Sequence, residues 1–330
     1  MLTNTHLLSK STFVRGSQCK KSLYLNKYHR HLRDKVDDST QAIFDSGHKV
    51  GELAQDLFPG GVDTRFYEDF DVEKAVNKTK HLIESGVTVI YEAAFMFEEC
   101  LTVIDILMND GTGWKAYEVK SSASVKKEQI LDISYQYFII TKSGLALEDI
   151  FIVYINNRYV RYGNPNISEL FNIESLKDRV FENEEIIHKS ILEFKEVLIS
   201  DSIPVISIGE YCSKPYTCDF YTNCWKDIPE NSIFELIGMR NKKKFSLYES
   251  GIISLLDIPP DMELNVYQQI QLKAIKSNEI HIDVVKIKEF LDGLNYPLHF
   301  ILSIWLMVQM ILVNHLLDRL LTILKEPVIL

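Results

Sequence analysis

The alternation of apolar and polar residues predicts a set of strands in the first half of the chain. A turn-forming run, Asn109-Asp110-Gly111-Thr112-Gly113, separates two of them and is typical of a hairpin loop. A later apolar run should be followed by a second hairpin return at Asn156-Asn157-Arg158. We expect strands over Val87–Phe97, Cys100–Met108, Trp114–Ser122 and Ile150–Ile155.

Helical spacing of apolar residues predicts helices around these strands. Asp71 is suited to cap a helix that ends before Gly86. Another helix should carry His48 beside its apolar face and stop at Pro59-Gly60-Gly61. That face consists of Ile43, Gly47, Val50, Ala54 and Leu57. The predicted helices cover Leu7–Leu32, Gln41–Phe58, Asp71–Ser85, Lys126–Ile140 and Ile173–Ser200.

The order helix, three strands, helix, strand predicts an α/β fold with a central mixed sheet flanked by helices. We expect this domain to occupy residues 1–226. A smaller helical region should follow over 227–297, where Gly251-Ile252 resembles the turn of a helix–hairpin–helix motif, although an ordinary helix end explains it as well. Residues 298–330 form a separate apolar tail.

Composition narrows the function classes. A net charge of −10 argues against a uniformly basic nucleic-acid binder, but it leaves room for a local basic groove. Met1–Ser22 contains no long apolar run typical of a secretion signal. Five cysteines without such a signal favour the reducing cytoplasm, where thiols stay free or bind metal. We find no glycine-rich phosphate loop, nucleophile elbow or internal repeat.

The central hairpin carries the strongest chemical signal. Asp105 lies in its first strand, and Glu118 and Lys120 lie two residues apart in its second strand, so these two share one face. Pairing across the hairpin can bring Asp105 near both. Carboxylates in an apolar sheet need a partner, and a divalent cation is a natural one. The plainer interpretation is an exposed structural salt bridge, which the apolar flanks make the weaker of the two.

Cysteines give the second signal. Cys212, Cys218 and Cys224 recur at six-residue intervals in an aromatic, turn-rich segment, and Cys19 is the best fourth partner. Cys100 lies in an apolar strand and is expected to be a buried thiol. Zinc ribbons favour cysteine pairs two to four residues apart, whereas iron–sulfur clusters tolerate more varied spacing. Free cysteines and a zinc site remain the alternatives to a structural cluster.

Together these motifs resemble one known family. His48, Asp105, Glu118-Val119-Lys120 and Gln136, with one early and three late cysteines, are similar to RecB-type PD-(D/E)XK nucleases that carry an iron–sulfur cluster. The exonucleases of CRISPR adaptation and the AddB nuclease subunit belong to this group. The resemblance covers roughly residues 7–225 and is nearest to an uncharacterised bacterial subgroup.

The resemblance implies a restriction-endonuclease-like core and a metal-dependent DNA nuclease, expected to be an exonuclease in DNA processing, repair or defence. It implies Asp105, Glu118 and His48 as ligands of Mg²⁺ or Mn²⁺. It implies that Lys120 orients or activates the attacking water and that Gln136, with Tyr135 or Tyr137 nearby, positions DNA or the lysine. A 4Fe–4S cluster would be held by Cys19, Cys212, Cys218 and Cys224. Candidate phosphate contacts are Lys20, Lys21, Lys126 and Lys127, each of which can equally be solvated helix surface.

The chain departs from the family in two places. No proline precedes Asp105, and the glycine often found shortly before that aspartate is absent. In the bacterial subgroup, a stretch like Asn295–Phe300 opens a ribonuclease-H-like exonuclease domain, whose Asp-x-Glu pair is missing here. We therefore expect Ile301–Leu330 to be a truncated or frameshifted tail.

Two other function classes compete with the nuclease. One is a non-catalytic nucleic-acid-binding protein with a structural zinc site. The other is a membrane-anchored protein, because Leu298–Leu317 contains no Asp, Glu, Lys or Arg and has the length of a membrane span. The favoured partner is DNA that is single-stranded or has free ends, with a helicase or defence-system protein as a further partner, and no membrane.

Overall fold

The computed structural model describes residues 8–65 and 71–293. The chain divides into two compact units between Pro229 and Glu230, close to the boundary predicted after residue 226. The elements that carry the predicted site residues all belong to the first unit.

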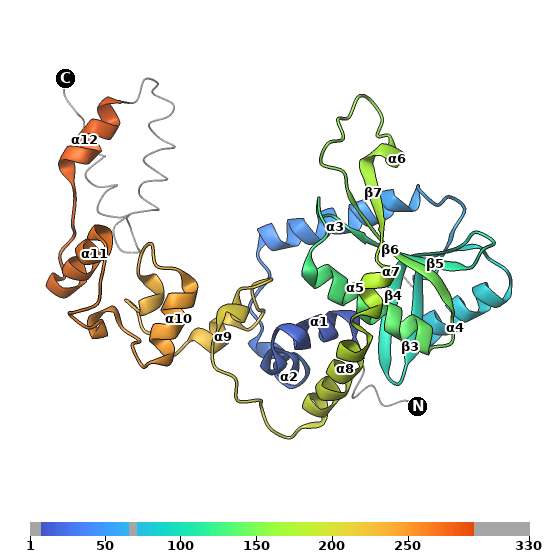
Figure 1. Ribbon diagram of the computed structural model, residues 1–330, viewed down its shortest axis with the longest axis horizontal. Helices are drawn as coiled ribbons and strands as arrows, with labels where there is room; N and C mark the ends of the chain where they lie inside the picture. The colour runs from blue at the N-terminus through green and yellow to red at the C-terminus, as the bar shows by residue number, and fades with distance from the viewer. Residues whose placement is uncertain (1–7, 66–70, 294–330) are drawn as a thin grey trace. The chain divides into compact units, whose positions relative to one another are not determined.

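Seven described strands form one mixed sheet in the first unit, in the order β2-β3-β4-β5-β6-β7, with β1 paired to β4 (Figure 1). Strands β3, β4 and β5 are antiparallel neighbours, as are β6 and β7. Strand β6 runs parallel to β5, because helix α5 crosses between them. The strands are β1 Leu8–Ser9, β2 Val62–Asp63, β3 Val89–Phe97, β4 Cys100–Asn109, β5 Trp114–Lys120, β6 Leu147–Ile155 and β7 Phe171–Ser175.

Helices cover both faces of this sheet, which confirms the predicted α/β class. Apolar side chains of α1, α5 and α8 belong to the larger core cluster, exemplified by Phe13, Ile133 and Phe194. Helix α3 contributes Ala54 to the second cluster on the other face. The helices are α1 Lys10–Gln18, α2 Lys20–Tyr28, α3 Asp38–Gln55, α4 Val72–Glu84, α5 Lys127–Lys142, α6 Ile167–Leu170, α7 Lys177–Phe181, α8 Glu184–Ile199 and α9 Tyr221–Trp225, with single 3₁₀ turns at η1 Arg30–Leu32 and η2 Glu210–Cys212.

An irregularity in the sheet occurs opposite Asp105. Glu92 of β3 has a φ of 56°, a left-handed conformation that interrupts an otherwise continuous β3–β4 ladder. Residues two apart on a regular strand share a face, yet Ile104 and Ile106 belong to different core clusters. The strand therefore changes face at Asp105, so its side chain is not buried among the apolar residues of either layer.

Strands β4 and β5 separate at the same level. Their last paired residues are Ile106 and Tyr117, whereas β5 continues along β6 as far as Lys120. Strand β1 pairs with β4 at Cys100 and Leu101, on the edge that β5 has left. The edge of β4 between Leu101 and Ile106 is therefore left without a paired strand on this side, and we call this gap in the pairing the notch. Helix α1 begins directly after β1, at one end of the notch.

Three helical predictions need correction. The predicted helix over 7–32 is two helices, because Cys19 has an extended backbone that ends α1 and begins α2. The predicted helix over 173–200 begins later, because β7 occupies its start and a break separates α7 from α8. On α3, the apolar face is packed only near its C-terminal end, and Ile43 is 65% exposed.

The predicted hairpin return at 156–158 is also wrong. Strand β6 does pair with an antiparallel strand, β7, but the connection runs over residues 156–170 and contains α6. Asn156 instead supports this longer loop, because its side chain donates to the carbonyl of Glu169 at 2.9 Å.

The second unit is helical where it is described. Its core gathers Ile233, Leu236, Leu255, Ile258 and Leu272. Gly251, with a φ of 89°, ends α10, and the chain then forms one 3₁₀ turn rather than an α-helix, because Pro259 and Pro260 prevent its extension. The elements are η3 Ile233–Glu235, α10 Asn241–Glu249, η4 Leu255–Asp257, α11 Val266–Ser277 and α12 Val284–Asp292.

Within residues 8–65 and 71–293, no helix has the length and apolarity needed to cross a bilayer. The candidate span Leu298–Leu317 and the predicted tail over 298–330 lie outside the described residues.

The close packing of α1 generates a stability prediction. A Cβ on Gly16 would lie 2.9 Å from the ring of the buried Phe194. We expect Gly16→Ala to lower the free energy of unfolding by about 1–3 kcal/mol through overpacking. Urea denaturation measures this.

Gly47→Ala is the matched control, because Gly47 also lies within a helix and nothing is found within 4 Å of its added Cβ. This variant should be neutral or stabilised by up to about 1 kcal/mol. Equal effects of the two substitutions would contradict the proposed close contact between α1 and α8.

Candidate active site and cysteine pocket

The notch between β4 and β5 brings Asp105 together with β5. Where the strands separate, the Asp105 Oδ2 atom accepts a hydrogen bond from the main-chain N–H of Val119 at 2.6 Å. The carboxylate thus replaces the main-chain acceptor that a continuing ladder would supply. Its position is fixed by the same strand separation that opens the notch.

Glu118 is the most enclosed carboxylate of this site, with 1% of its surface exposed. Its Oε1 atom accepts from Lys10 Nζ at 2.8 Å and from Lys120 Nζ at 2.7 Å. Its Oε2 atom accepts from Gln136 Nε2 at 2.7 Å. Burial opposes ionisation, but the ammonium groups of Lys10 and Lys120 lower the pKa of Glu118 to about 2. Glu118 is therefore a charged group at neutral pH.

Lys120 is held between two carboxylates. Its Nζ atom lies 2.6 Å from Asp132 Oδ2 as well as 2.7 Å from Glu118 Oε1. Burial acts against its charge, but these two carboxylates raise the pKa of Lys120. Asp132 and Gln136 lie one turn apart on α5, which is how a single helix orients both Lys120 and Glu118.

Two buried oxygens of this cluster have no partner among the described residues. They are Asp132 Oδ1 and Gln136 Oε1. A buried acceptor without a donor is costly, so such atoms are places where ordered water or an ion's water shell fits. These two oxygens can therefore accept hydrogen bonds from bound water, in addition to the ion pairs that the site already contains.

Asp105 has the opposite electrostatic setting to Glu118. Burial and the neighbouring Glu118 carboxylate raise the pKa of Asp105 to about 8, although Lys10 and the N–H of Val119 partly counter them. Glu92 lies opposite Asp105 across the ladder and adds negative charge. Burial also raises the pKa of Glu92 itself, with Arg65 acting in the other direction at 4.0 Å. Asp105 therefore lies in a buried setting where neighbouring carboxylates outweigh the effect of Lys10.

The structure brings together Asp105, Glu118, Lys120 and Gln136 of the predicted site residues, but not all the others. His48 is exposed on α3, and no hydrogen bond or ion pair joins it to the acidic cluster among the described residues. Tyr135 is fully buried and donates to the carbonyl of Leu8 at 2.6 Å, so its predicted contact with nucleic acid is wrong. It packs the interior face of α5 instead.

The predicted phosphate-contacting lysines lie in different surroundings. Lys20 forms an ion pair with Glu193. Lys21 Nζ is 3.5 Å from the carbonyl of Ile206, beside the cysteines. Lys126 and Lys127 are exposed at the start of α5 and remain candidate contacts.

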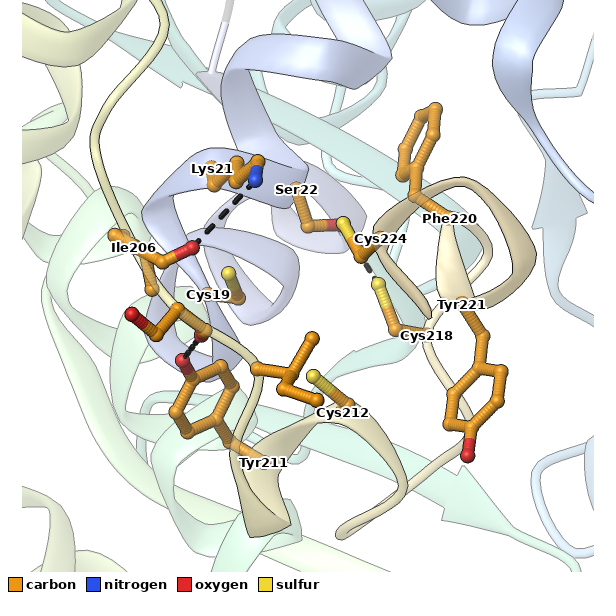
Figure 2. A pocket seen from close by; sticks show the side chains of 12 residues that line it. Cys19, Lys21, Ser22, Ile206, Tyr211, Cys212, Cys218, Phe220, Tyr221 and Cys224 are labelled. Atoms are coloured by element: carbon orange, nitrogen blue, oxygen red, sulfur yellow. Dashed lines mark hydrogen bonds between the residues drawn. The ribbon is translucent and has the colours of Figure 1, made fainter. Parts of the chain in front are cut away.

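The four predicted cluster cysteines line one pocket of about 350 Å³, part of which is open to solvent. Figure 2 shows their sulfur atoms around this common space, with Cys19 on one side and Cys212, Cys218 and Cys224 from the late segment. All are free thiols, as is Cys100, which is 1% exposed in β4. Burial raises the pKa of the Cys100 thiol to about 11.

The surroundings of the cysteine pocket contain groups that oppose ionisation of the thiols and groups that favour it. Burial raises the pKa of Cys19, although the N–H groups of Ser22 and Lys21 favour its thiolate. The main-chain N–H of Gly209 lies 3.5 Å from the Cys212 sulfur, within reach of a weak hydrogen bond. Within the described part of the chain, no three His, Cys, Asp or Glu side chains converge closely enough to hold a single metal ion.

Salt bridges connect the cysteine segment to the N-terminal helices. Asp219 accepts from Arg15 of α1 at 2.6 Å and also pairs with Arg33. The side chain of Gln18 donates to the carbonyls of Tyr211 and Tyr216 at 2.6 and 2.7 Å. The late cysteines are therefore anchored against α1 by polar contacts of the protein itself.

The sequence patterns gave no indication of Lys10 and no role for Asp132. Lys10 lies 108 positions from Glu118, in a Ser/Thr-rich run whose composition is typical of an exposed segment. Asp132 had a usable signal, because its spacing of four residues from Gln136 places both on one helical face.

The raised pKa of Asp105 generates a pH prediction for the metal-free protein. Asp105 titrates near pH 8 when folded and near its ordinary value of 3.8 when unfolded. The unfolded chain therefore releases this proton first, and the free energy of unfolding falls as the pH rises from about 4 to 8. Asp105→Asn should remove this component.

Urea denaturation in EDTA at pH 6.0 and 8.5 measures this pH dependence. Between the two pH values, the free energy of unfolding of the wild type should fall by about 1–3 kcal/mol more than that of Asp105→Asn. An identical pH dependence of both proteins would show that Asp105 ionises normally.

Comparisons with known proteins concern the fold alone. No protein-family model matches this chain, and no curated protein matches it. Among solved structures, LHK-Exo in complex with dAMP aligns with 59% of this chain and 91% of its own, at 11% identity and a TM-score of 0.34. SSO0001 aligns over 61% and 88%, at 10% identity and a TM-score of 0.28. Another structure of the alkaline exonuclease LHK-Exo, from Laribacter hongkongensis, aligns over 56% and 93%, at 12% identity and a TM-score of 0.23.

Proposed function

We propose that this chain is a metal-dependent DNA nuclease that hydrolyses phosphodiester bonds at free ends. The observation that carries the proposal is the convergence of Asp105, Glu118 and Lys120 in the notch between β4 and β5. Two carboxylates beside a charged amine are the groups that metal-assisted phosphodiester hydrolysis requires. The motif resemblance drawn from the sequence assigns these same residues to the nuclease site.

The residues present fit a divalent cation. Mg²⁺ is usually bound through one or two carboxylates, several waters and substrate phosphates, so a cage of three protein ligands is not required. Asp105 and Glu118 supply the two carboxylates, and burial together with the neighbouring Glu118 carboxylate raises the pKa of Asp105. We retain His48 as a further ligand only as a prediction, since it lies exposed on α3.

Each residue then has a role in hydrolysis. A bound Mg²⁺ or Mn²⁺ would polarise the phosphoryl oxygen and lower the pKa of a coordinated water. Lys120 would orient the attacking water and stabilise negative charge that develops on the phosphate. Asp132 fixes the Lys120 ammonium, and Gln136 fixes the second oxygen of Glu118. Both act by positioning.

We further propose that Cys19, Cys212, Cys218 and Cys224 hold a 4Fe–4S cluster. Four thiols around one pocket support this proposal, because each thiolate of a 4Fe–4S cluster binds a different iron. N–H groups directed at Cys19 and Cys212 are the kind of contact that tunes such sulfurs. The cluster would tie the first helices to the late segment and stabilise the domain.

The proposed nuclease activity predicts that Lys120→Met lowers the rate of Mg²⁺- or Mn²⁺-dependent cleavage of end-labelled DNA by at least about 100-fold. Lys115→Met is the matched control, because Lys115 lies on the same strand but pairs with Asp110 in the exposed hairpin end. The control should cleave within about twofold of the wild-type rate. Cleavage by the wild type in EDTA, or full activity of folded Lys120→Met, would overturn the assignment.

The cluster part predicts about four irons and four sulfides per chain after anaerobic purification. Cys19→Ala should lose this iron and lower the melting temperature, whereas Cys100→Ala should retain it, because Cys100 is packed in the core. Stoichiometric zinc in place of iron would favour a structural zinc site instead. Iron binding unaffected by Cys19→Ala would reject Cys19 as a ligand.

A further inference from the structure

Lys10 is a charged group of the active site that the nuclease roles above leave unused. It is the first residue of α1, and its Nζ atom lies 2.8 Å from Glu118 Oε1. We propose that Lys10 binds a phosphate of the nucleic-acid substrate in this notch. This inference rests on the proposed function, because it names a substrate contact of that same site.

Both carboxylate oxygens of Glu118 have a hydrogen-bond donor without Lys10. Lys120 already donates to Oε1 of Glu118, and Gln136 donates to Oε2. Each carboxylate oxygen thus has a donor without Lys10, which makes Lys10 the second ammonium on one oxygen. Lys10 is therefore a second cation on an oxygen that Lys120 already contacts, and it can leave Glu118 without removing the last donor of that oxygen.

Lys10 is also the more accessible partner. Its side chain is 28% exposed, whereas that of Glu118 is 2% exposed. An ammonium has three donor hydrogens, so one contact with Glu118 leaves others for a ligand that enters from the solvent side. The structure therefore allows Lys10 to exchange Glu118 for a phosphate oxygen without moving its backbone.

The charge balance of the notch favours that exchange. Lys10 and Lys120 face Glu118, Asp132 and Asp105, while Glu92 and Asp63 share Arg65. A divalent cation that joins the carboxylates would supply the positive charge that Glu118 now receives from Lys10. Lys10 would then be released to pair with a phosphate oxygen.

Helix α1 holds the backbone of Lys10 in place. The ring of Phe13 stacks on Tyr135 with a centroid distance of 4.4 Å, and Gly16 lies directly against Phe194. The side chain of Ser9 caps the helix by accepting from the N–H of Thr12. Only the flexible side chain of Lys10 needs to move, so little conformational entropy opposes phosphate binding.

The test measures binding rather than cleavage. A fluorescein-labelled single-stranded oligonucleotide is titrated with protein in Ca²⁺, and separately in EDTA, at several salt concentrations. Each phosphate contact contributes about 0.7 to the slope of log affinity against log salt concentration for single strands. We expect Lys10→Met to reduce this slope by about 0.7 and Lys10→Arg to preserve it.

Lys142→Met is the control for charge loss alone. Lys142 also pairs with a glutamate, at 3.1 Å from Glu184, but it lies in the last turn of α5 and no ion pair joins it to the cluster among the described residues. Its slope should equal that of the wild type. A slope for Lys10→Met that equals the wild-type slope would overturn the proposal.

A double variant covers the case in which Lys10→Met does not fold. Glu118→Gln removes the buried charge that Lys10→Met alone would leave poorly balanced, so the comparison becomes Glu118→Gln with and without Lys10→Met. A difference of about 0.7 in slope supports the phosphate contact, and equal slopes reject it.

The outcomes also separate this inference from the proposed function. A Lys10-dependent slope without metal-dependent cleavage by the wild type supports the contact and rejects the nuclease. Metal-dependent cleavage with a slope that does not depend on Lys10 supports the nuclease and rejects the phosphate contact. A wild-type protein that binds no oligonucleotide in either Ca²⁺ or EDTA overturns the phosphate contact.

Discussion

The buried carboxylate of Glu118 is the constraint on which the rest of the site depends. An ionised carboxylate almost without solvent must be balanced by partners, and removing one partner of such a pair typically costs about 3–5 kcal/mol. Its partners come from three elements, because Lys10 begins α1, Lys120 lies on β5 and Gln136 lies on α5. The position of two helices relative to the sheet is therefore linked to the charge of one side chain. The strand separation at Ile106 and Tyr117 provides the opening in which these partners meet.

Helix α1 joins this site to the cysteine pocket. Lys10 is its first residue and Cys19 follows its last, so the two lie about 14 Å apart along a helix of nine residues. Arg15 and Gln18 of the same helix contact the segment that carries the late cysteines. A group held by the four thiols would therefore affect the position of α1. A cluster there would support the active site mechanically, without contributing to the chemistry.

Much of the fold could be predicted from sequence because its signals are local. The central hairpin, the cap at Asp71 and the grouping of Glu118 with Lys120 follow from two-residue alternation and turn chemistry, which need no tertiary knowledge. Lys10 could not be found in this way, because its contact with Glu118 joins residues 108 positions apart and depends on where β4 and β5 separate.

The orientation of α5 was equally hidden from the sequence. Nearly every residue from Gln129 to Ile140 is buried, so the helix has no polar stripe that would indicate which side faces the sheet. This is why Tyr135 was misassigned to nucleic acid, and why the contact of Gln136 with Glu118 was not foreseen when Gln136 was expected to position DNA or Lys120. The break at Cys19 was missed because neither a proline nor a glycine stands at that position to mark it.

The central claim is that Asp105 and Glu118 form a site for a divalent cation, and proton release tests it most directly. Titration calorimetry with Mn²⁺ at pH 7, in buffers of different ionisation enthalpy, counts the protons displaced on binding. Because Asp105 holds its proton to about pH 8 in the metal-free protein, binding should release close to one proton at pH 7 and far fewer at pH 9. Asp105→Asn should release none. Absence of Mn²⁺ binding, or binding with no proton released at either pH, would contradict the account.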